Sequence, residues 1–181
     1  MKNPWQILAE QEIYDNPWIH VSEFDVISPG GVKGIYGKVS FKNQAVGIVP
    51  FENGYIWLVG QYRFALNRYS WEIPEGGSPA AELPLQSAKR ELKEETGLIA
   101  RHYQVLLEMH LSNSVTDEWG IVYLATGLSQ SEAEPEHTED ITRRKVKLTD
   151  AYKMVEQREI TDSLTVAAIY KLMLLNVQNE L

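Results

Sequence analysis

The stretch that decides the fold is Gly76–Leu98, GGSPAAELPLQSAKRELKEETGL. Apolar residues recur within it at helical spacing, at Leu85, Ala88 and Leu92, which places them on one face of a helix. A proline is tolerated in the first turn of a helix, and a glycine favours the left-handed conformation that ends one. The sequence therefore predicts a helix over Pro84–Thr96, preceded by a glycine-rich loop and followed at once by a glycine.

Three acidic residues, Glu91, Glu94 and Glu95, fall within one arc of this predicted helix, beside the arc that faces the core. Like charges three and four residues apart repel by roughly 0.2–0.5 kcal/mol per pair. The acids either form a solvated surface, which composition alone favours, or hold a divalent cation such as Mg²⁺, which prefers oxygen ligands. Arg90 lies four residues before Glu94 and could pair with it. Gly76–Gly77 would let the backbone approach a ligand closely.

The composition limits the classes of protein to which this chain can belong. The chain has 181 residues, of which 44% are hydrophobic, and a formal net charge of −8; this fits one globular domain with a modest extension. The negative charge and the lack of a basic run argue against binding to nucleic acid or to an anionic membrane. There is no cysteine, so disulfides and thiolate metal sites are excluded. With no signal-peptide pattern and no apolar run of the ~20 residues that span a bilayer, we expect a cytoplasmic protein.

Outside the central stretch the sequence favours strands. The first forty or so residues alternate as extended structure around a turn at Ser28–Gly31, which is typical of a β-hairpin unit. Asn53-Gly54 predicts a tight hairpin turn because both residues tolerate positive φ. Further strands are expected at 45–51, 55–62, 69–73, 103–111, 120–126 and 141–148, with a loop at 129–138. Two C-terminal helices follow, the second capped by Thr161 or Asp162, so we expect a mixed sheet flanked by helices.

The spacing of the central stretch is more specific than its composition. It reads Gly76, five residues, Glu82, seven residues, and then Arg90–Leu98 as RELKEETGL. This is similar, at every fixed position, to the signature G-x5-E-x7-R-E-U-x-E-E-x-G-U of the Nudix hydrolases. The resemblance implies an α+β class and a Nudix fold, an α/β/α sandwich with a mixed β-sheet plus an N-terminal antiparallel β-extension. It also implies a division into residues 1–43, the extension, and 44–181, the hydrolase domain.

The same resemblance implies a metal site. In Nudix enzymes the loop and helix bind Mg²⁺ or Mn²⁺, and the metal bridges a diphosphate while water attacks one phosphorus. By resemblance, Glu91 and Glu95 are the principal ligands, Glu94 is a further or water-mediated ligand, and the backbone carbonyl of Glu75 completes the site. Arg90 would grip the glutamates of the motif.

Segments beside the motif resemble the branch that hydrolyses ADP-ribose and other nucleoside diphosphate sugars. Gly60–Arg63, GQYR, resembles the strand-ending Q-Y-R of that branch, in which Arg63 would contact the substrate phosphate or base region. Trp71–Gly76 resembles its E-x-P-A-G, with Glu75 where alanine is usual. Glu72 would accept hydrogen bonds from the base or the sugar, and the alternative is an acid on the surface of a strand edge.

A loop acid orients the attacking water in this branch. By resemblance we nominate Glu139, with Glu134 and Glu136 as rivals because the length of this loop varies. Ser112–Glu118, SNSVTDE, resembles a loop that approaches the terminal sugar, and Glu118 is its best polar candidate.

The N-terminal residues resemble an extension that relatives exchange between the subunits of a homodimer, where it helps to form the base pocket. Trp5, Trp18 and Tyr36 are candidates for stacking on the base across such an interface. The alternative is that these aromatic side chains pack on their own sheet.

These observations predict a metal-dependent enzyme that hydrolyses the pyrophosphate bond of a nucleoside diphosphate sugar, ADP-ribose or an NDP-hexose, to NMP and a sugar phosphate. Two alternatives remain at this stage. One is a Nudix nucleoside triphosphate pyrophosphatase, and the other is a non-catalytic Nudix domain that senses a nucleotide. The preferred base and sugar and the number of metals stay open.

Overall fold

The computed structural model describes residues 1–131 and 140–181. Its strands are β1 (Gln6–Asp15), β2 (Ile19–Ile27), β3 (Lys33–Phe41), β4 (Asn43–Glu52), β5 (Tyr55–Arg63), β6 (Arg68–Glu72), β7 (Glu75–Pro79), β8 (Leu98–His110), β9 (Trp119–Gln130) and β10 (Thr142–Lys147). Its α-helices are α1 (Pro84–Thr96), α2 (Leu148–Glu156) and α3 (Ser163–Gln178), and a 3₁₀ turn covers Phe64–Leu66. No helix in these two ranges is long and apolar enough to cross a membrane.

Helix α1 has the bounds that the sequence predicts. It begins at Pro84 and ends at Gly97, whose φ of 71° lets its N–H donate to the carbonyl oxygen of Lys93 at 2.8 Å. Ala88 and Leu92 are fully buried, as their spacing requires. The helix is therefore held by its apolar stripe and its glycine end, and it carries its glutamates beside the buried face.

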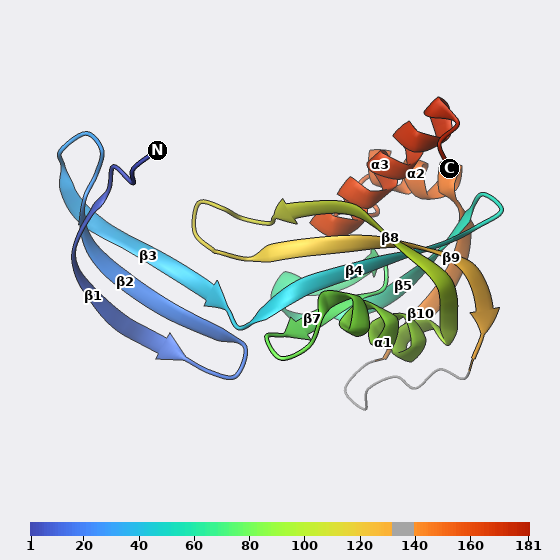
Figure 1. Cartoon of the computed structure of the whole chain (residues 1–181), viewed down its shortest axis with the longest axis horizontal. Helices are drawn as coiled ribbons and strands as arrows, with labels where there is room; N and C mark the ends of the chain where they lie inside the picture. Colours follow the sequence, from blue (N-terminus) through green and yellow to red (C-terminus); the bar gives the residue numbers. More distant parts are fainter. Residues whose placement is uncertain (132–139) are drawn as a thin grey trace.

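The main sheet has strand order β10-β5-β4-β9-β8, and the short strands β6 and β7 pair with β5 and β4. Its pairs are antiparallel except for β4 with β9, which is parallel. Side chains alternate across β4: Val46 and Ile48 pack with α1, whereas Val49 packs with α2 and α3. The sheet is thus the middle of three layers, with α1 on one face and α2 and α3 on the other (Figure 1), and the predicted α/β/α sandwich is confirmed.

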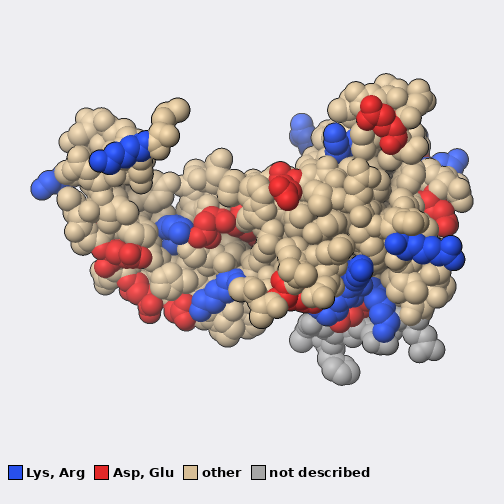
Figure 2. Space-filling model, viewed as in Figure 1, with Lys and Arg blue, Asp and Glu red and all other residues tan. Residues whose placement is uncertain are grey.

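The N-terminal residues form a second, antiparallel sheet of order β1-β2-β3, which projects from the body as a separate lobe (Figures 1 and 2). The sequence predicts a hairpin in this region, and the structure adds β1, which is exposed along its whole length. On the face shown in Figure 2, acidic and basic side chains are interspersed over both lobes.

The structure corrects or extends some of the local predictions and confirms another. The glycine-rich segment before α1 is a strand, β7, because Gly76 and its neighbours pair with β4 around Val46. Strand β8 begins directly after α1 and β9 continues to Gln130, so both exceed the predicted ranges. The Asn53-Gly54 turn is confirmed, with φ of 52° and 80°.

Candidate active site

The carboxylates of α1 lie against the backbone of β7. Glu95 is buried, with 1% of its surface exposed, and its Oε2 accepts a hydrogen bond from the Glu75 amide at 2.9 Å. A Cβ atom on Gly76 would overlap the carboxylate of Glu91, so a side chain at this position would have to push that carboxylate aside. The motif glycine and the motif glutamates therefore form one packed unit.

Arg90 connects this unit to the rest of the motif. Its Nη1 lies 2.8 Å from a carboxylate oxygen of Glu91 and 2.9 Å from one of Glu94. Its Nη2 donates to the carbonyl oxygen of Gly77 at 3.2 Å and lies 3.6 Å from Glu82. Burial alone would lower the pKa of Arg90, but the charge of Glu91 and the hydrogen bond to Glu94 outweigh it and raise the pKa. The contact expected between Arg90 and Glu94 is present.

A second group of charges lies where β5, β6 and β7 meet. Arg63 Nε donates to both carboxylate oxygens of Glu72 at 3.0 Å, and its Nη2 donates to Glu75 Oε1 at 2.7 Å. Burial would lower the pKa of Arg63, but the hydrogen bond to Glu72 and the charges of Glu75 and Glu72 raise it. Glu72 is 2% exposed, which excludes the alternative that it is a surface acid.

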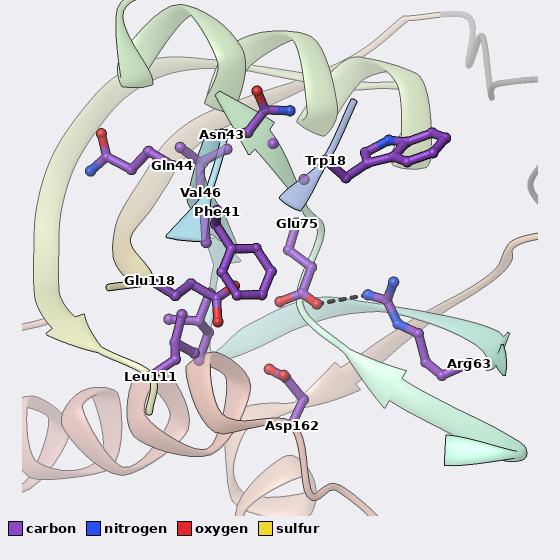
Figure 3. Close-up of a pocket in the computed structure, with 14 residues that line it drawn as sticks. Trp18, Phe41, Asn43, Gln44, Val46, Arg63, Glu75, Leu111, Glu118 and Asp162 are labelled. Carbon is purple, nitrogen blue, oxygen red and sulfur yellow. Dashed lines mark hydrogen bonds and ion pairs between the residues drawn. The ribbon is translucent and has the colours of Figure 1, made fainter. Parts of the chain in front are cut away.

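A cavity of about 430 Å³ opens between these groups and the N-terminal sheet. Figure 3 shows its lining: Arg63 meets Glu75 on one side, Glu118 and Phe41 lie across from Arg63, Asp162 lies below them, and Trp18 lies above Arg63. The lining includes Trp18, Phe41, Arg63, Glu75, Glu118 and Asp162, together with Gly76 and Gly77 of the motif. Among the described residues that line it, Arg63 is the only cation. The cavity is therefore acidic and partly aromatic.

Burial and mutual repulsion act on two of these acids. Burial raises the pKa of Glu75 well above its usual value, and the negative charges of Asp162 and Glu72 raise it further. Burial and the charge of Asp162 also raise the pKa of Glu118. Glu75 Oε2 is buried without a hydrogen-bond partner among the described residues. The cavity thus concentrates negative charge that would be stabilised by a cation.

The sequence predicts a site role for six of the fourteen residues that line the cavity, and these are Trp18, Arg63, Glu75, Gly76, Gly77 and Glu118. Asp162 was expected only as a helix cap; it does cap α3, accepting from the Thr165 amide at 2.8 Å, and it also lines the cavity. Phe41 was not singled out, and no local pattern distinguishes it from other aromatic strand residues. The position of Asp162 directly before the buried first turn of α3 is the signal that could have pointed to its place at the cavity.

Other expected residues lie elsewhere. Trp5 and Tyr36 contact each other edge to face, with ring centroids 5.4 Å apart, and line a separate hollow on the N-terminal sheet. They pack on their own sheet, as the alternative predicted, whereas Trp18 reaches the cavity. Glu139 and its rivals Glu134 and Glu136 lie outside the described residues.

The residues present fit a hard divalent cation by their chemistry. The candidate ligands, Glu91, Glu94, Glu95 and the carbonyl of Glu75, supply only oxygen. A cation would be stabilised by the buried Oε2 of Glu75, which has no hydrogen-bond partner among the described residues, and by the acidic wall of the cavity. Within residues 1–131 and 140–181, however, no three acidic or histidine side chains are already grouped as metal ligands. Since Arg90 pairs with Glu91 and Glu94, a bound cation would compete with its guanidinium for these carboxylates.

Two family descriptions match the sequence. Residues 42–164 match the family described as NUDIX domain, and residues 5–39 match the one described as nucleoside diphosphate sugar hydrolase N-terminal domain. The first match contains the motif, α1 and the cavity residues of the body. The second contains β1, β2 and nearly all of β3.

Similar proteins cover most of the chain. The ADP-ribose pyrophosphatase of Bacillus subtilis (strain 168) is 34% identical over 169 residues, which are 92% of this chain and 91% of that protein. The ADP-ribose pyrophosphatase of Mycobacterium tuberculosis is 40% identical over 129 residues, 69% of this chain and 62% of that protein. A crystal structure of an ADP compounds hydrolase superposes with a TM-score of 0.86 at 21% identity, over 98% of this chain and 97% of the other. That likeness supports the fold.

Proposed function

The chain belongs to the NUDIX domain family and is a Nudix hydrolase, and from this premise we propose that it hydrolyses the pyrophosphate bond of a nucleoside diphosphate sugar. ADP-ribose would yield AMP and ribose 5-phosphate, and an NDP-hexose would yield NMP and a hexose 1-phosphate. The observation that carries the proposal is the shared cavity, which is lined by Gly76 of the motif and the preceding Glu75 together with Arg63, Glu118 and Trp18. The relatives named ADP-ribose pyrophosphatase support this choice.

The proposed metal ligands are Glu91 and Glu95, with Glu94 as a further ligand and the carbonyl of Glu75 completing the set. A Mg²⁺ ion, or Mn²⁺ in its place, would neutralise diphosphate charge and lower the pKa of a coordinated water. The protein itself fixes the geometry of the set. Glu95 bonds to the β7 backbone at Glu75, and Arg90 orients the other two carboxylates.

Proton removal from the attacking water is assigned to a loop acid. We propose Glu139 for this role, as the resemblance implies, with Glu134 and Glu136 as the rivals that mutagenesis must compare. All three precede β10, which pairs with β5 and thus belongs to the sheet that carries Arg63. A carboxylate in this role acts as a general base, which contributes typically 10²–10⁴-fold to the rate.

The remaining cavity residues would hold the substrate. Arg63, the cation of the cavity wall, would contact a phosphate or the base. The sequence predicts that Glu72 accepts hydrogen bonds from the base or sugar, but Glu72 is not among the residues that line the cavity, so we propose instead that it orients Arg63 through its paired hydrogen bonds. Glu118 would accept hydrogen bonds from sugar hydroxyl groups. Trp18 would supply an aromatic surface on which a base can stack.

We further propose that residues 1–43 form a dimerisation extension and residues 44–181 the catalytic domain. The support is the exposed apolar surface of the first strand, where Ile7, Leu8 and Ile13 are each more than half exposed. An apolar surface of this kind is typical of protein–protein contacts. Sedimentation equilibrium at micromolar concentration tests the homodimer, and a monomer at all concentrations would contradict it.

The function is tested by a hydrolysis screen with Mg²⁺ across ADP-ribose, ADP-glucose, GDP-mannose, UDP-glucose and dNTPs, with identification of the products. We expect NMP and a sugar phosphate from at least one nucleotide sugar, at a higher kcat/KM than for any dNTP. Glu95→Gln is expected to reduce kcat by about 100-fold or more with an unchanged circular dichroism spectrum, because a carboxylate ligand is lost. Preferred hydrolysis of dNTPs would favour the triphosphatase alternative, and tight binding without Mg²⁺-stimulated turnover would favour a sensor.

A further inference from the structure

One carboxylate joins the N-terminal sheet to the loop between β8 and β9. Asp117 Oδ2 accepts a hydrogen bond from Ser40 Oγ at 2.8 Å and lies 2.8 Å from Lys38 Nζ. Its Oδ1 accepts from the Phe41 amide at 3.2 Å. All three partners come from the end of β3, far from Asp117 in the sequence. Asp117 therefore receives three donors from a single strand end.

The backbone of the same loop continues this contact. The Val39 amide donates to the carbonyl oxygen of Val115 at 2.9 Å, and the Asp117 amide donates to that of Val39 at 3.4 Å. Val39 and Thr116 form a parallel bridge, and the Tyr36 hydroxyl donates to the carbonyl oxygen of Ser114. The loop thus lies along β3 like a short extra strand, with Asp117 at its end.

This junction stands directly behind the cavity wall. Glu118 follows Asp117 in the chain, Phe41 is bonded to Asp117, and Trp18 accepts at its carbonyl oxygen from the Lys42 amide at 2.9 Å. Glu118, Phe41 and Trp18 all line the cavity, whereas Asp117 is not among its lining residues. In Figure 3 the side chains of Glu118 and Phe41 lie next to each other and opposite Arg63.

The electrostatics of the junction agree with a permanent ion pair. Burial raises the pKa of Asp117, but the hydrogen bonds from Lys38, Ser40 and the Phe41 amide outweigh it, and the pKa is lowered. The carboxylate is about two-fifths exposed, so its contribution to global stability is small. We expect the loss of the Asp117 carboxylate to change the arrangement of its neighbours more than it changes the free energy of unfolding.

We propose that Asp117 is a positioning residue for substrate binding: by fastening the end of β3 to the β8–β9 loop, it places Glu118 and Phe41 on the same wall of the cavity. The proposal rests on the proposed function, since it assigns this wall to the sugar or base of the substrate. The hydrogen bonds and the ion pair of Asp117 described above all run to the end of β3, so we expect it to act on binding and to leave the hydrolytic groups in place.

The test is the split between KM and kcat in Asp117→Ala and Asp117→Asn, with the best nucleotide sugar of the screen as substrate. We expect Asp117→Ala to raise KM about tenfold, which corresponds to about 1.4 kcal/mol, and to change kcat less than about threefold. Asp117→Asn keeps the shape and one acceptor but loses the ion pair, so its effect on KM is expected to be intermediate. Asp150→Asn, which removes a surface carboxylate paired with Lys153, is the matched control and is expected to leave both constants unchanged.

A double-mutant cycle separates positioning from general weakening. If Asp117 acts by placing Glu118, then Glu118→Gln raises KM less in the Asp117→Ala background than in the wild type. Fully additive effects would overturn the proposal, as would an Asp117→Ala enzyme with unchanged KM.

A second measurement does not depend on turnover. Amide hydrogen exchange at Val39 and Phe41 is expected to accelerate in Asp117→Ala and not in Asp150→Asn, because both amides are bonded across the junction. Unchanged exchange would refute the fastening itself. Should the wild type hydrolyse no nucleotide sugar, the proposed function fails, and this exchange together with the dissociation constant for ADP-ribose still decides the role of Asp117.

Discussion

Arg63 holds two carboxylates together at one wall of the cavity. Glu72 is almost completely buried, and Glu75 adds a second negative charge beside it. Without the Arg63 guanidinium, Glu72 and Glu75 would lie close together with little access to water and with no cation beside them. A buried ion pair contributes little by its formation, but removal of one partner is costly.

This predicts that Arg63→Ala lowers the free energy of unfolding by about 3 kcal/mol, the size found when a buried charge loses its partner. Urea unfolding at neutral pH measures the change. Arg63→Ala/Glu75→Ala removes one of the two stranded charges and should recover part of the loss. Equal stability of wild type and Arg63→Ala would show that the two acids are solvated or protonated.

Gly76 is a second residue at which the structure predicts the effect of a substitution. A methyl group there would occupy the place of the Glu91 carboxylate, so Gly76→Ala must displace a proposed metal ligand. We expect Mg²⁺ or Mn²⁺ affinity, measured by calorimetry in the absence of substrate, to fall about tenfold, equivalent to about 1.4 kcal/mol. Gly34→Ala is the matched control, because nothing lies within 4 Å of its added Cβ. Unaltered affinity in Gly76→Ala would remove Glu91 from the ligand set.

Among the elements, α3 anchors the segment that carries the cavity acids. Thr165, in its first turn, is buried, and its Oγ1 accepts the Ile73 amide at 2.9 Å. Ile73 lies between Glu72 and Glu75, so the helix start fixes the chain between β6 and β7. The same helix start places Asp162 at the cavity.

Thr165→Val keeps the shape of the side chain but leaves the Ile73 amide without its acceptor. We expect a loss of about 1–3 kcal/mol, the cost of a buried unsatisfied donor, and a rise in KM because Glu72 and Glu75 lose their support. Thermal unfolding and steady-state kinetics measure the two effects. Thr165→Ser retains the hydroxyl and should restore the KM; if it does not, packing of the methyl group is the cause.

At the scale of the whole molecule, charge poses a problem for the proposed reaction. A chain with a formal net charge of −8 and an acidic cavity must bind a substrate that is itself anionic. Arg63 is already paired with two acids, so the positive charge has to come with a cation. The divalent ion that we propose on the α1 glutamates would supply this charge.

We therefore expect EDTA to abolish hydrolysis and added Mg²⁺ or Mn²⁺ to restore it. The far-ultraviolet circular dichroism spectrum should stay the same, because α1 is held by its own apolar stripe and its glycine end. Turnover that survives exhaustive chelation would refute the proposed metal dependence.

The sequence alone determined the features that depend on neighbouring residues. The period of apolar side chains and the terminal glycine set the bounds of α1, and Asn53-Gly54 set a hairpin turn. The sequence also narrowed the cap of α3 to Thr161 or Asp162, of which the structure shows Asp162. The spacing of the motif also predicted the family, because so many fixed positions within one short stretch leave little room for chance. These signals are local dihedral preferences and side-chain periods, which can be evaluated without knowing the rest of the fold.

The tertiary structure decided what depends on distant partners. The glycine-rich segment forms β7 because its backbone pairs with that of β4. Glu72 is a buried partner of Arg63 because β5 and β6 place the two side chains next to each other. Asp117 lies at the end of β3, seventy-seven residues from Ser40 in the chain, and Phe41, whose amide donates a hydrogen bond to Asp117, lines the cavity. No local pattern encodes such pairings, since their free energy arises only when the packed layers bring both groups to one place.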